Sequence, residues 1–290
     1  MRPMHTSGGS RRAARVALGA LLVVVALAGC SSTKNDSAAP AAPSETTIAA
    51  GPLKILVTND DGVGAAGIDA VVEGLRKLPD TEVTVVAPAT NESGTGGKTT
   101  SGPLTVTDAT TVSGYPAKAV AGYPADTIIW AIDNHGIDFT PDLVVSGINF
   151  GQNLGPATDV SGTVGAARAA AARNIPSLAS SQGLGDPPAY PTSVTAVLAW
   201  VAAHRAALSS GTIIKPVLLE NLNIPTCVTG APRATVTVPV ATNDTGRDYN
   251  KVDCTSTATD PTDDIAGFSE GFITVSTLHP ITTTGTTKPS

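Results

Sequence analysis

The pattern of apolar and polar positions begins with a short apolar run that ends in a polar turn. Residues 55–58 are Ile-Leu-Val-Thr, and positions 59–62 are Asn-Asp-Asp-Gly. The unbroken apolar run predicts a buried strand, and the polar tetrapeptide predicts a turn at its end. Apolar positions within residues 67–78 then recur at helical spacing. The patterned part of the chain therefore starts with a strand, a turn that carries two carboxylates, and a helix.

Strands and helices alternate through most of the remaining chain. Apolar runs predict strands at residues 82–88, 141–149, 177–180, 217–221 and 271–278, with a weaker strand region at 112–120, and helical spacing predicts helices at 127–132, 164–173 and 194–208. Such alternation builds a mostly parallel sheet, so we predict an α/β fold. Between residues 226 and 267 the pattern changes to Thr, Val, Asp and Pro, which predicts hairpins or an arm outside the main sheet.

The first 50 residues have the composition of an export signal and a tether. Residues 1–15 carry four arginines and no acid, and an apolar run of 13 residues ends in Leu-Ala-Gly-Cys30. This combination resembles a bacterial lipoprotein signal, which predicts cleavage before Cys30 and lipid attachment to its sulfur. The alternative is a secretory signal with an incidental cysteine. We therefore expect a signal at 1–29, a flexible Ser/Ala/Pro tether at 30–50, a domain at 51–285, and anchoring to the outer face of the cell membrane.

Charge and cysteine content narrow the possible partners and the compartment. The 290 residues include 18 basic and 24 acidic side chains, so no basic face for polymeric nucleic acid is expected. The two cysteines after Cys30 are Cys227 and Cys254. In an exported chain such a pair predicts a disulfide, and two buried free thiols are the alternative. We favour the disulfide because the segment between the cysteines is polar and weakly patterned.

The paired carboxylates Asp60 and Asp61 are the first candidates for chemistry. Adjacent carboxylates repel one another in a concave site unless a cation lies between them or one of them is protonated. A hard divalent metal ion is therefore our first hypothesis. The alternative is structural: Asn59 and Asp60 would form an Asx turn, and Asp61 would cap the next helix.

A glycine-rich loop follows the strand predicted at residues 141–149. It contains Gly151, Asn153 and Gly155, and it leads through Ser161 and Thr163 into an alanine-rich helix. A strand, a glycine-rich loop and a helix start offer backbone N–H groups to a phosphate. The alternative is that Ser161 or Thr163 is only the N-cap of the helix. A P-loop motif of the form Gly-x-x-x-x-Gly-Lys-Ser/Thr is absent.

Five short motifs follow one another along the chain. They are Ile55-Leu-Val-Thr-Asn-Asp-Asp-Gly62, Val85-Val-Ala-Pro88 with Ser93-Gly94, Gly122-Tyr-Pro-Ala-Asp126, Ser146-Gly-Ile-Asn149 and Ser161-Gly-Thr-Val-Gly-Ala-Ala167. Together they resemble the SurE-type survival protein 5′/3′-nucleotidases over roughly residues 53–280. The resemblance implies a Rossmann-like three-layer α/β core and a homodimer or homotetramer formed through a C-terminal arm at about residues 226–280. It also implies metal-dependent hydrolysis of nucleoside monophosphates.

The resemblance also implies a set of site residues. The expected metal ligands are Asp60, Asp61, Ser93 and Asn149, and the expected phosphate-binding residues are Asn59, Asn153, Ser161, Gly162 and Thr163. An all-oxygen set suits one Mg²⁺ or Mn²⁺ ion per chain, with Ca²⁺ as a further candidate. Asp60 and Asp61 are the expected catalytic residues. We favour attack by metal-activated water over attack by Asp60, because the Asp-x-Asp signature of phosphoaspartyl hydrolases is absent.

A second hypothesis is an exported binding protein that holds a phosphorylated or other anionic ligand without turnover. It is favoured by Glu92, which stands where the family usually has an arginine. The enzyme is favoured by the intact pair Asp60 and Asp61 and by Ser161-Gly-Thr163. We favour the enzyme because the expected metal ligands are all retained.

Overall fold

The structure, a computed structural model, describes residues 51–212 and 215–279. The strands are β1 (Leu53–Thr58), β2 (Thr81–Pro88), β3 (Thr105–Thr110), β4 (Pro116–Ala121), β5 (Leu143–Phe150), β6 (Ser177–Gln182), β7 (Leu219–Ile224), β8 (Arg233–Thr237) and β9 (Phe272–Thr277). The helices are α1 (Ala66–Leu75), α2 (Pro124–Ile128), α3 (Gly162–Ala171), α4 (Tyr190–Leu208) and α5 (Asp264–Ser269), with a π-helical turn at Ile129–Asp133 and a 3-10 turn at Gly155–Asp159. The α/β alternation predicted from the sequence is confirmed.

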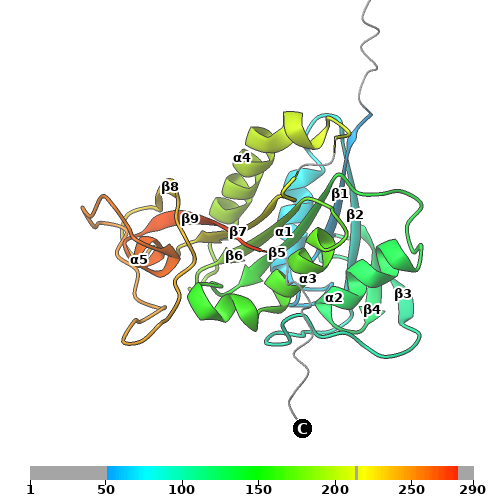
Figure 1. Cartoon of the computed structure of the whole chain (residues 1–290), viewed down its shortest axis with the longest axis horizontal. Helices are drawn as coiled ribbons and strands as arrows, with labels where there is room; N and C mark the ends of the chain where they lie inside the picture. Colours follow the sequence, from blue (N-terminus) through cyan, green and yellow to red (C-terminus); the bar gives the residue numbers. More distant parts are fainter. Residues whose placement is uncertain (1–50, 213–214, 280–290) are drawn as a thin grey trace, which may run out of the picture. The chain divides into compact units, whose positions relative to one another are not determined.

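The strands of the described residues form one mixed, mostly parallel sheet. Their order is β3-β4-β2-β1-β5-β6-β7-β9-β8 (Figure 1). β3 runs antiparallel to β4 and β9 antiparallel to β7, whereas the other neighbouring strands are parallel. The chain passes from β1 to β2 on one side and later places β5 on the other side of β1. Loops that follow two such strands diverge and leave a crevice where ligands bind.

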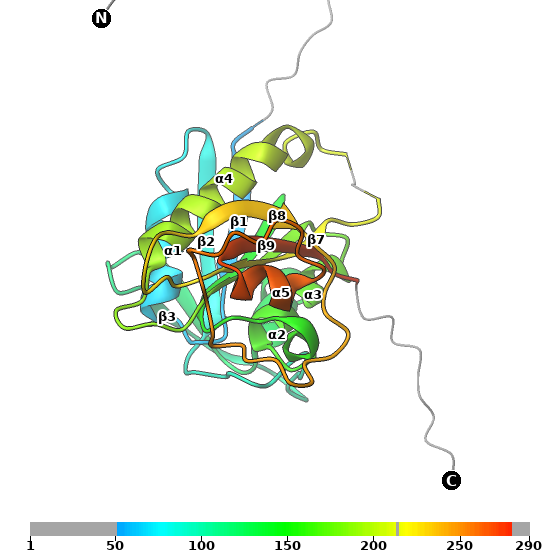
Figure 2. The same ribbon diagram turned by 90° about the vertical axis from the view of Figure 1, so that its left-hand side faces the viewer.

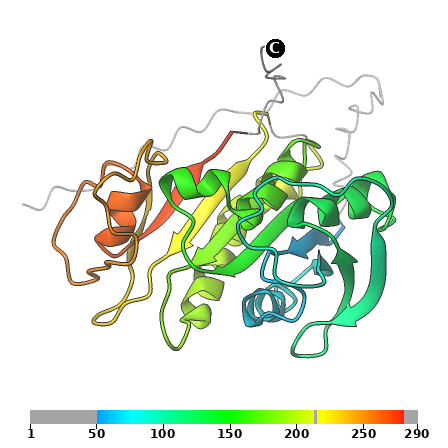
Figure 3. The same ribbon diagram turned by 90° about the horizontal axis from the view of Figure 1, so that it is seen from below.

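Helices cover both faces of the sheet, so the fold has three layers (Figures 2 and 3). Successive side chains of a strand point to opposite faces. Ile55 of β1 therefore packs in one hydrophobic cluster with Val71 of α1 and Val197 of α4. Leu56 packs on the opposite face with Ile128 of α2 and with alanines of α3. The buried run predicted at residues 55–58 thus supplies both layers of the core.

Helix α1 packs directly on β5 at a glycine. A Cβ atom at Gly67 would lie 1.9 Å from the carbonyl oxygen of Ile148, so only glycine permits this contact. The helix ends at Leu75, three residues before the predicted end at Leu78. Pro79 follows directly and disfavours a helical conformation at Leu78. The apolar side chain of Leu78 still packs against the same core cluster.

The C-terminal part differs from the prediction of an arm outside the main sheet. β8 and β9 extend the sheet beyond β7 instead of forming separate hairpins. Four of the six residues of β9 are buried, and α5 packs against this strand. A short strand with an alternating pattern can pair with any free edge of a sheet, so its sequence does not determine which strand it pairs with. For the same reason β3, whose residues are mostly exposed threonines and an aspartate, was not predicted.

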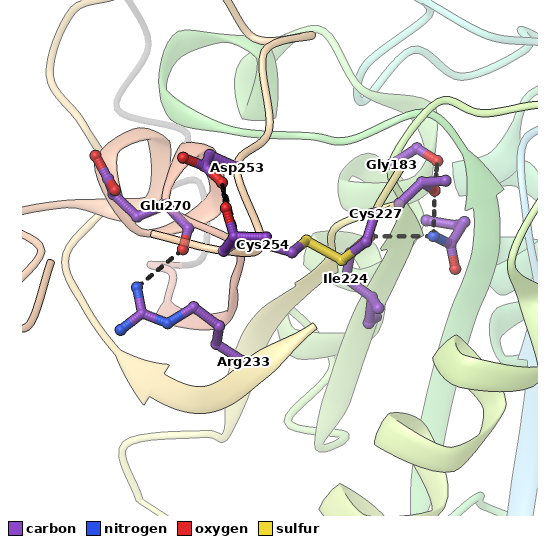
Figure 4. Close-up of a disulfide and its surroundings, with 10 residues drawn as sticks. Gly183, Ile224, Cys227, Arg233, Asp253, Cys254 and Glu270 are labelled. Atoms are coloured by element: carbon purple, nitrogen blue, oxygen red, sulfur yellow. Dashed lines mark hydrogen bonds between the residues drawn. A yellow bond between two sulfur atoms is a disulfide. The ribbon is translucent and has the colours of Figure 1, made fainter. Parts of the chain in front are cut away.

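The predicted disulfide between Cys227 and Cys254 is confirmed, with a Cα–Cα distance of 5.8 Å (Figure 4). Cys227 lies just after β7, and Cys254 lies in the loop between β8 and α5. That loop is also held by a hydrogen bond from the Asp253 N–H to the Ser269 carbonyl oxygen at 2.8 Å. The disulfide therefore ties a long connection to the carboxyl end of the central sheet.

The predictions for residues 1–50 lie outside the described residues. They concern the signal at 1–29, lipidation of Cys30 and the tether at 30–50. Within 51–212 and 215–279, no helix has both the length and the apolar character that a membrane span requires.

Candidate functional site

The two carboxylates after β1 lie at the switch point of the sheet. β5 pairs in parallel with β1, so the chain leaves both strands at the same edge. Asp61 Oδ2 accepts a hydrogen bond from the backbone N–H of Phe150, the last residue of β5, at 3.0 Å. The loop after β2 reaches the same place, because the Glu92 N–H donates to the Asp60 carbonyl oxygen at 2.7 Å. Three loops therefore meet at Asp60 and Asp61.

Asp60 is buried against the N-terminus of α3. Its side chain accepts a hydrogen bond from Thr163 Oγ1 at 2.7 Å, and only 3% of the residue is exposed. A Cβ atom at Gly162 would lie 2.8 Å from the Asp60 Cβ, so glycine allows this close contact. Burial raises the pKa of Asp60, and hydrogen bonds from Thr163 and Gly162 oppose the rise. The positive end of the helix favours an anion at this position.

Asp61 is half-buried and lies beside a second acid. Burial raises its pKa to about 6; the hydrogen bond from Phe150 lowers the pKa, and repulsion from Asp60 raises it. Asn91 Nδ2 approaches Asp61 Oδ1 at 3.4 Å. In the part of the chain that the structure describes, no lysine, arginine or histidine pairs with either carboxylate. A bound cation would neutralise this uncompensated charge.

The loop after β2, residues 89–103, is an integral part of the site. Asn91 Oδ1 accepts a hydrogen bond from the Ser93 N–H at 3.0 Å, so Asn91 connects the predicted ligand Ser93 to Asp61. Farther along, Gly96 contacts α3: a Cβ atom at Gly165 would lie 2.0 Å from the Gly96 carbonyl oxygen. The loop is thus held between the carboxylates and the helix start, with Ser93 exposed at the surface.

Asn149, the fourth predicted metal ligand, lies beside Asp61 at the end of β5. Its side-chain Nδ2 donates to the Gly151 carbonyl oxygen at 2.6 Å, and the residue is 8% exposed. This bond fixes the carboxamide and leaves its Oδ1 without a hydrogen bond from any described residue. The structure therefore brings Asp60, Asp61 and Asn149 together and leaves neutral oxygen available next to the carboxylates.

Asn153 is fixed by polar side chains at the carboxyl ends of β6 and β7. Its Nδ2 donates to Ser181 Oγ at 2.9 Å, and its backbone N–H donates to Asn223 Oδ1 at 2.8 Å. Its carbonyl oxygen accepts from Asn221 Nδ2 at 2.7 Å and from Asn223 Nδ2 at 3.1 Å. Asn153 is thus held in one orientation at the base of the glycine-rich loop.

Ser161 and Thr163, both predicted to bind phosphate, have different roles at the start of α3. Ser161 Oγ accepts a hydrogen bond from the Val164 N–H at 3.1 Å and is the N-cap, which leaves its hydroxyl hydrogen free to donate. Thr163 is fully buried and donates to Asp60. The Thr163 side chain therefore supports a carboxylate, and a direct phosphate contact for it is not supported.

Asn59 forms the turn after β1 instead of facing a ligand. Its Nδ2 donates to the Gly62 carbonyl oxygen at 2.8 Å, and its Oδ1 accepts from the Gly62 N–H at 3.2 Å. Asn59 is fully buried, and Gly62 has a φ of +99°, which favours glycine. The geometry agrees with the alternative that Asn59 forms an Asx turn and gives no support to a phosphate contact.

Several residues of the site were missed by sequence reasoning. They hold the loops in place and comprise Asn91, Asp126, Ser181, Tyr190, Asn221, Asn223 and Asp264. Asp126 accepts from Thr100 Oγ1 at 2.7 Å, and Asp264 accepts from the Gly155 N–H at 2.9 Å, so each fixes one loop of the site. The Asn-x-Asn pattern at 221–223 was a usable signal, because two amides on one face of a buried strand require buried partners.

The oxygen atoms gathered here fit a hard divalent cation. Two carboxylates, the Asn149 carboxamide and the Ser93 hydroxyl are the ligand types that Mg²⁺ and Mn²⁺ prefer. Across 51–212 and 215–279, no three His, Cys, Asp or Glu side chains cluster as a metal site would require. The candidate set therefore combines two acids with neutral oxygens and lacks the nitrogen and sulfur ligands typical of zinc.

Comparisons with known proteins give one family. The family described as Survival protein SurE matches residues 55–249. The chain is 42% identical to the 5'-nucleotidase SurE of Methanopyrus kandleri over 46% of this chain and 50% of that protein. It is 36% identical to the 5'-nucleotidase SurE of Dehalococcoides mccartyi over 78% of this chain and 89% of that protein. The match thus spans about half the length of the first relative and most of the second.

A solved structure agrees with this assignment. The crystal structure of the SurE protein from Aquifex aeolicus aligns with a TM-score of 0.62 and 26% identity, over 79% of this chain and 95% of that one. The shared fold, the family match and the two carboxylates after β1 lead to the same conclusion: the chain belongs to the SurE family.

Proposed function

We propose that this chain is a divalent-metal-dependent phosphomonoesterase that hydrolyses nucleoside monophosphates to nucleoside and phosphate. One observation carries the proposal: Asp60 and Asp61 form an uncompensated carboxylate pair beside a helix N-terminus at the switch point of the sheet. A cation and a phosphate together would balance the charges of such a site. The names of the relatives above, which are 5'-nucleotidases, support the same activity.

The chain offers two groups of residues for this reaction. Asp60, Asp61, Ser93 and Asn149 would hold one Mg²⁺ or Mn²⁺ ion, which when bound would neutralise charge on the phosphate and activate water. The Ser161 hydroxyl and the Asn153 carboxamide would orient the phosphate, and the positive end of the α3 helix would favour its charge. Thr163 would keep Asp60 in place through their hydrogen bond.

Burial of Asp60 favours attack by water over attack by this carboxylate. A nucleophile must approach phosphorus in line with the leaving oxygen. Asp60 is 3% exposed, and one of its oxygens accepts from Thr163. These constraints suit a ligand better than a nucleophile.

The proposed location is the outer face of the cell membrane, with a lipid anchor at Cys30. The basic start and Leu-Ala-Gly-Cys30 sequence support it. The Cys227–Cys254 disulfide supports export as well, because disulfides persist in oxidising compartments. A homodimer or homotetramer stays part of the proposal, although β8 and β9 lie in the main sheet and not in a separate arm.

The test is phosphate release from a panel of nucleoside monophosphates and an aryl phosphate, with Mg²⁺, Mn²⁺ or EDTA. Asp61→Asn should lower metal-dependent release by more than about a hundredfold, because loss of a residue that only supports a metal ligand already costs about 10–100-fold. Asp108→Asn is the matched control, because Asp108 is 88% exposed and pairs with Lys118. Wild-type rates in Asp61→Asn, or activity that persists fully in EDTA, would contradict the proposal.

The structure gives no specific support to binding without turnover. The Glu92 side chain that favoured it accepts a hydrogen bond from Thr90 Oγ1 at 3.2 Å. Its backbone, not its carboxylate, makes the contact with Asp60. A folded protein that binds Mn²⁺ and releases no phosphate from any substrate would favour the binding protein instead.

A further inference from the structure

Exposed apolar side chains gather around the carboxylates. Within the described ranges five large hydrophobic side chains are exposed: Val112, Phe150, Val160, Leu184 and Val228. Phe150 follows Asn149, Val160 precedes Ser161, and Leu184 lies in the loop after β6. Three of the five therefore belong to loops that border the site. An aromatic ring in water beside charged groups is a surface that a ligand can cover favourably.

Phe150 is tied directly to the site and is 44% exposed. Its backbone N–H donates to Asp61. It follows Ile148 by two residues, and Ile148 packs in the cluster under α1 and α4. Strand alternation therefore places the Phe150 side chain toward the start of α4, on the face opposite to α3.

Tyr190, in the first turn of α4, lies on the same side. Its ring approaches the start of α1, because a Cβ atom at Gly67 would lie 3.2 Å from Tyr190 Cε1. The same Cβ atom would lie 1.9 Å from the Ile148 carbonyl oxygen, so the Tyr190 ring lies beside the end of β5. The end of β5 thus has aromatic side chains on this side.

Leu184 extends the apolar surface along the loop after β5. A Cβ atom at Gly151, the residue after Phe150, would lie 3.5 Å from Leu184 Cδ2. The Leu184 N–H donates to Gln152 Oε1 at 3.1 Å, which holds the two loops together. Leu184 is 50% exposed, so it presents an uncovered aliphatic surface beside Gly151, two residues after the predicted ligand Asn149.

These positions define two sides of the site with different chemistry. Ser161 and the N-terminus of α3 lie on one side of the carboxylates and offer a hydroxyl donor and the positive end of a helix. Phe150, Leu184 and Tyr190 lie on the other side and offer two rings and an aliphatic chain. A substrate with a phosphate at one end and a flat apolar ring at the other matches this arrangement.

We propose that Phe150, Leu184 and Tyr190 form a subsite for the nucleobase of the substrate, in which the base packs on the Phe150 ring while the phosphate lies at Asp61. This inference rests on the proposed function and deepens it. It makes nucleoside monophosphates better substrates than phosphomonoesters of the same charge that lack a ring. Purine substrates should gain more than pyrimidine substrates, because their larger ring covers more apolar surface.

The experiment compares the full chain and its Phe150→Ala variant on adenosine 5′-monophosphate and on glycerol phosphate. Loss of base–aromatic stacking should lower kcat/KM for adenosine monophosphate by roughly tenfold or more, mainly through KM. The same variant should lower kcat/KM for glycerol phosphate far less, because the backbone N–H that donates to Asp61 is kept. Phe150→Trp should retain the preference, and Leu184→Ala should weaken it. Val112→Ala is the matched control, because Val112 is equally apolar, 65% exposed and far from the site in the β3–β4 turn.

Each outcome decides the inference. Equal losses on both substrates would mean that Phe150 only supports Asp61, which would overturn the subsite. Unchanged kcat/KM for both substrates in Phe150→Ala would also overturn it while leaving the phosphatase intact. If the unaltered protein hydrolyses neither substrate, the proposed function fails and the subsite fails with it.

Discussion

Reduction of the Cys227–Cys254 disulfide should destabilise the whole domain and not only the segment it closes. The segment between the cysteines contains β8, which pairs with β9 inside the main sheet. It also reaches the functional site, because Gln152 Nε2 donates to the Tyr249 carbonyl oxygen at 2.7 Å. Since these contacts tie the segment to the central sheet, the segment should unfold together with the domain.

The size of the effect follows from the loop that the disulfide closes in the unfolded chain. The cysteines are 27 residues apart, and closing a loop of that length costs the unfolded chain about 3.5 kcal/mol of conformational free energy at 25 °C. For a domain of this size, 1 kcal/mol corresponds to about 2–4 °C in Tm. Reduction should therefore lower Tm by about 7–14 °C.

The assay is thermal unfolding of the oxidised protein, the reduced protein and the double variant Cys227→Ser/Cys254→Ser. The reduced protein should have two more titratable thiols than the oxidised protein. Because Cys30 is present in both samples, it does not affect this difference. Reducing agent should leave the melting curve of the double variant unchanged. A Tm shift below about 2 °C, with reduction proved by the thiol count, would refute the reasoning.

Three further predictions concern the groups that support the site and the fold. Thr163→Val should lower Mn²⁺ affinity by about 10–100-fold, because it removes the hydrogen bond to Asp60 and keeps the size and shape of the side chain. Titration calorimetry with Mn²⁺ measures this affinity, and an unchanged value would contradict the prediction. Asp264→Asn should lower the free energy of unfolding, measured in urea, by about 1–3 kcal/mol. The Asp264 carboxylate accepts from two backbone N–H groups, whereas a carboxamide has only one accepting oxygen. An unchanged midpoint of urea unfolding would argue against the prediction. Burial acts to raise the pKa of Asp69, but hydrogen bonds from the β3–β4 turn outweigh it and hold the pKa below its ordinary value. Its stabilisation is therefore present above about pH 4 and lost as the pH falls further, so Asp69→Asn should flatten the acid limb of a stability–pH curve.

The central part of the fold could be predicted because its strands are buried on both faces. The mainly apolar runs within residues 55–58 and 141–149 have few other stable environments, and the alternation with helices predicted a parallel arrangement. The turn of Asn-Asp-Asp-Gly placed the two carboxylates correctly at a strand end. The predicted disulfide followed from compartment and composition, and its geometry was not needed.

The edges of the sheet and the supporting residues could not be predicted in the same way. β3 and β8 are short and largely exposed, so hydrophobic pattern says little about them. The roles of Asn91, Asp126 and Asp264 depend on loops that meet only in three dimensions, over separations of 26–109 residues. A sequence shows that such polar residues exist, but it does not show which backbone N–H or carboxylate each one meets.

The geometry also changes what the start of α3 can contribute to binding. The Ser161-Gly-Thr163 sequence pointed to three phosphate contacts, yet Thr163 is directed at Asp60 and Gly162 is the position where α3 comes closest to that carboxylate. The first N–H groups of α3 meet Asp60 and the Ser161 side chain, so the Ser161 hydroxyl and the positive end of the helix are left for an anion on this side. Because the Ser161 hydroxyl and the helix dipole do not depend on residue 92, the absence of an arginine at Glu92 removes charge without removing these groups. The loss of that positive charge should then weaken attraction of the substrate more than it disturbs the geometry of the reaction.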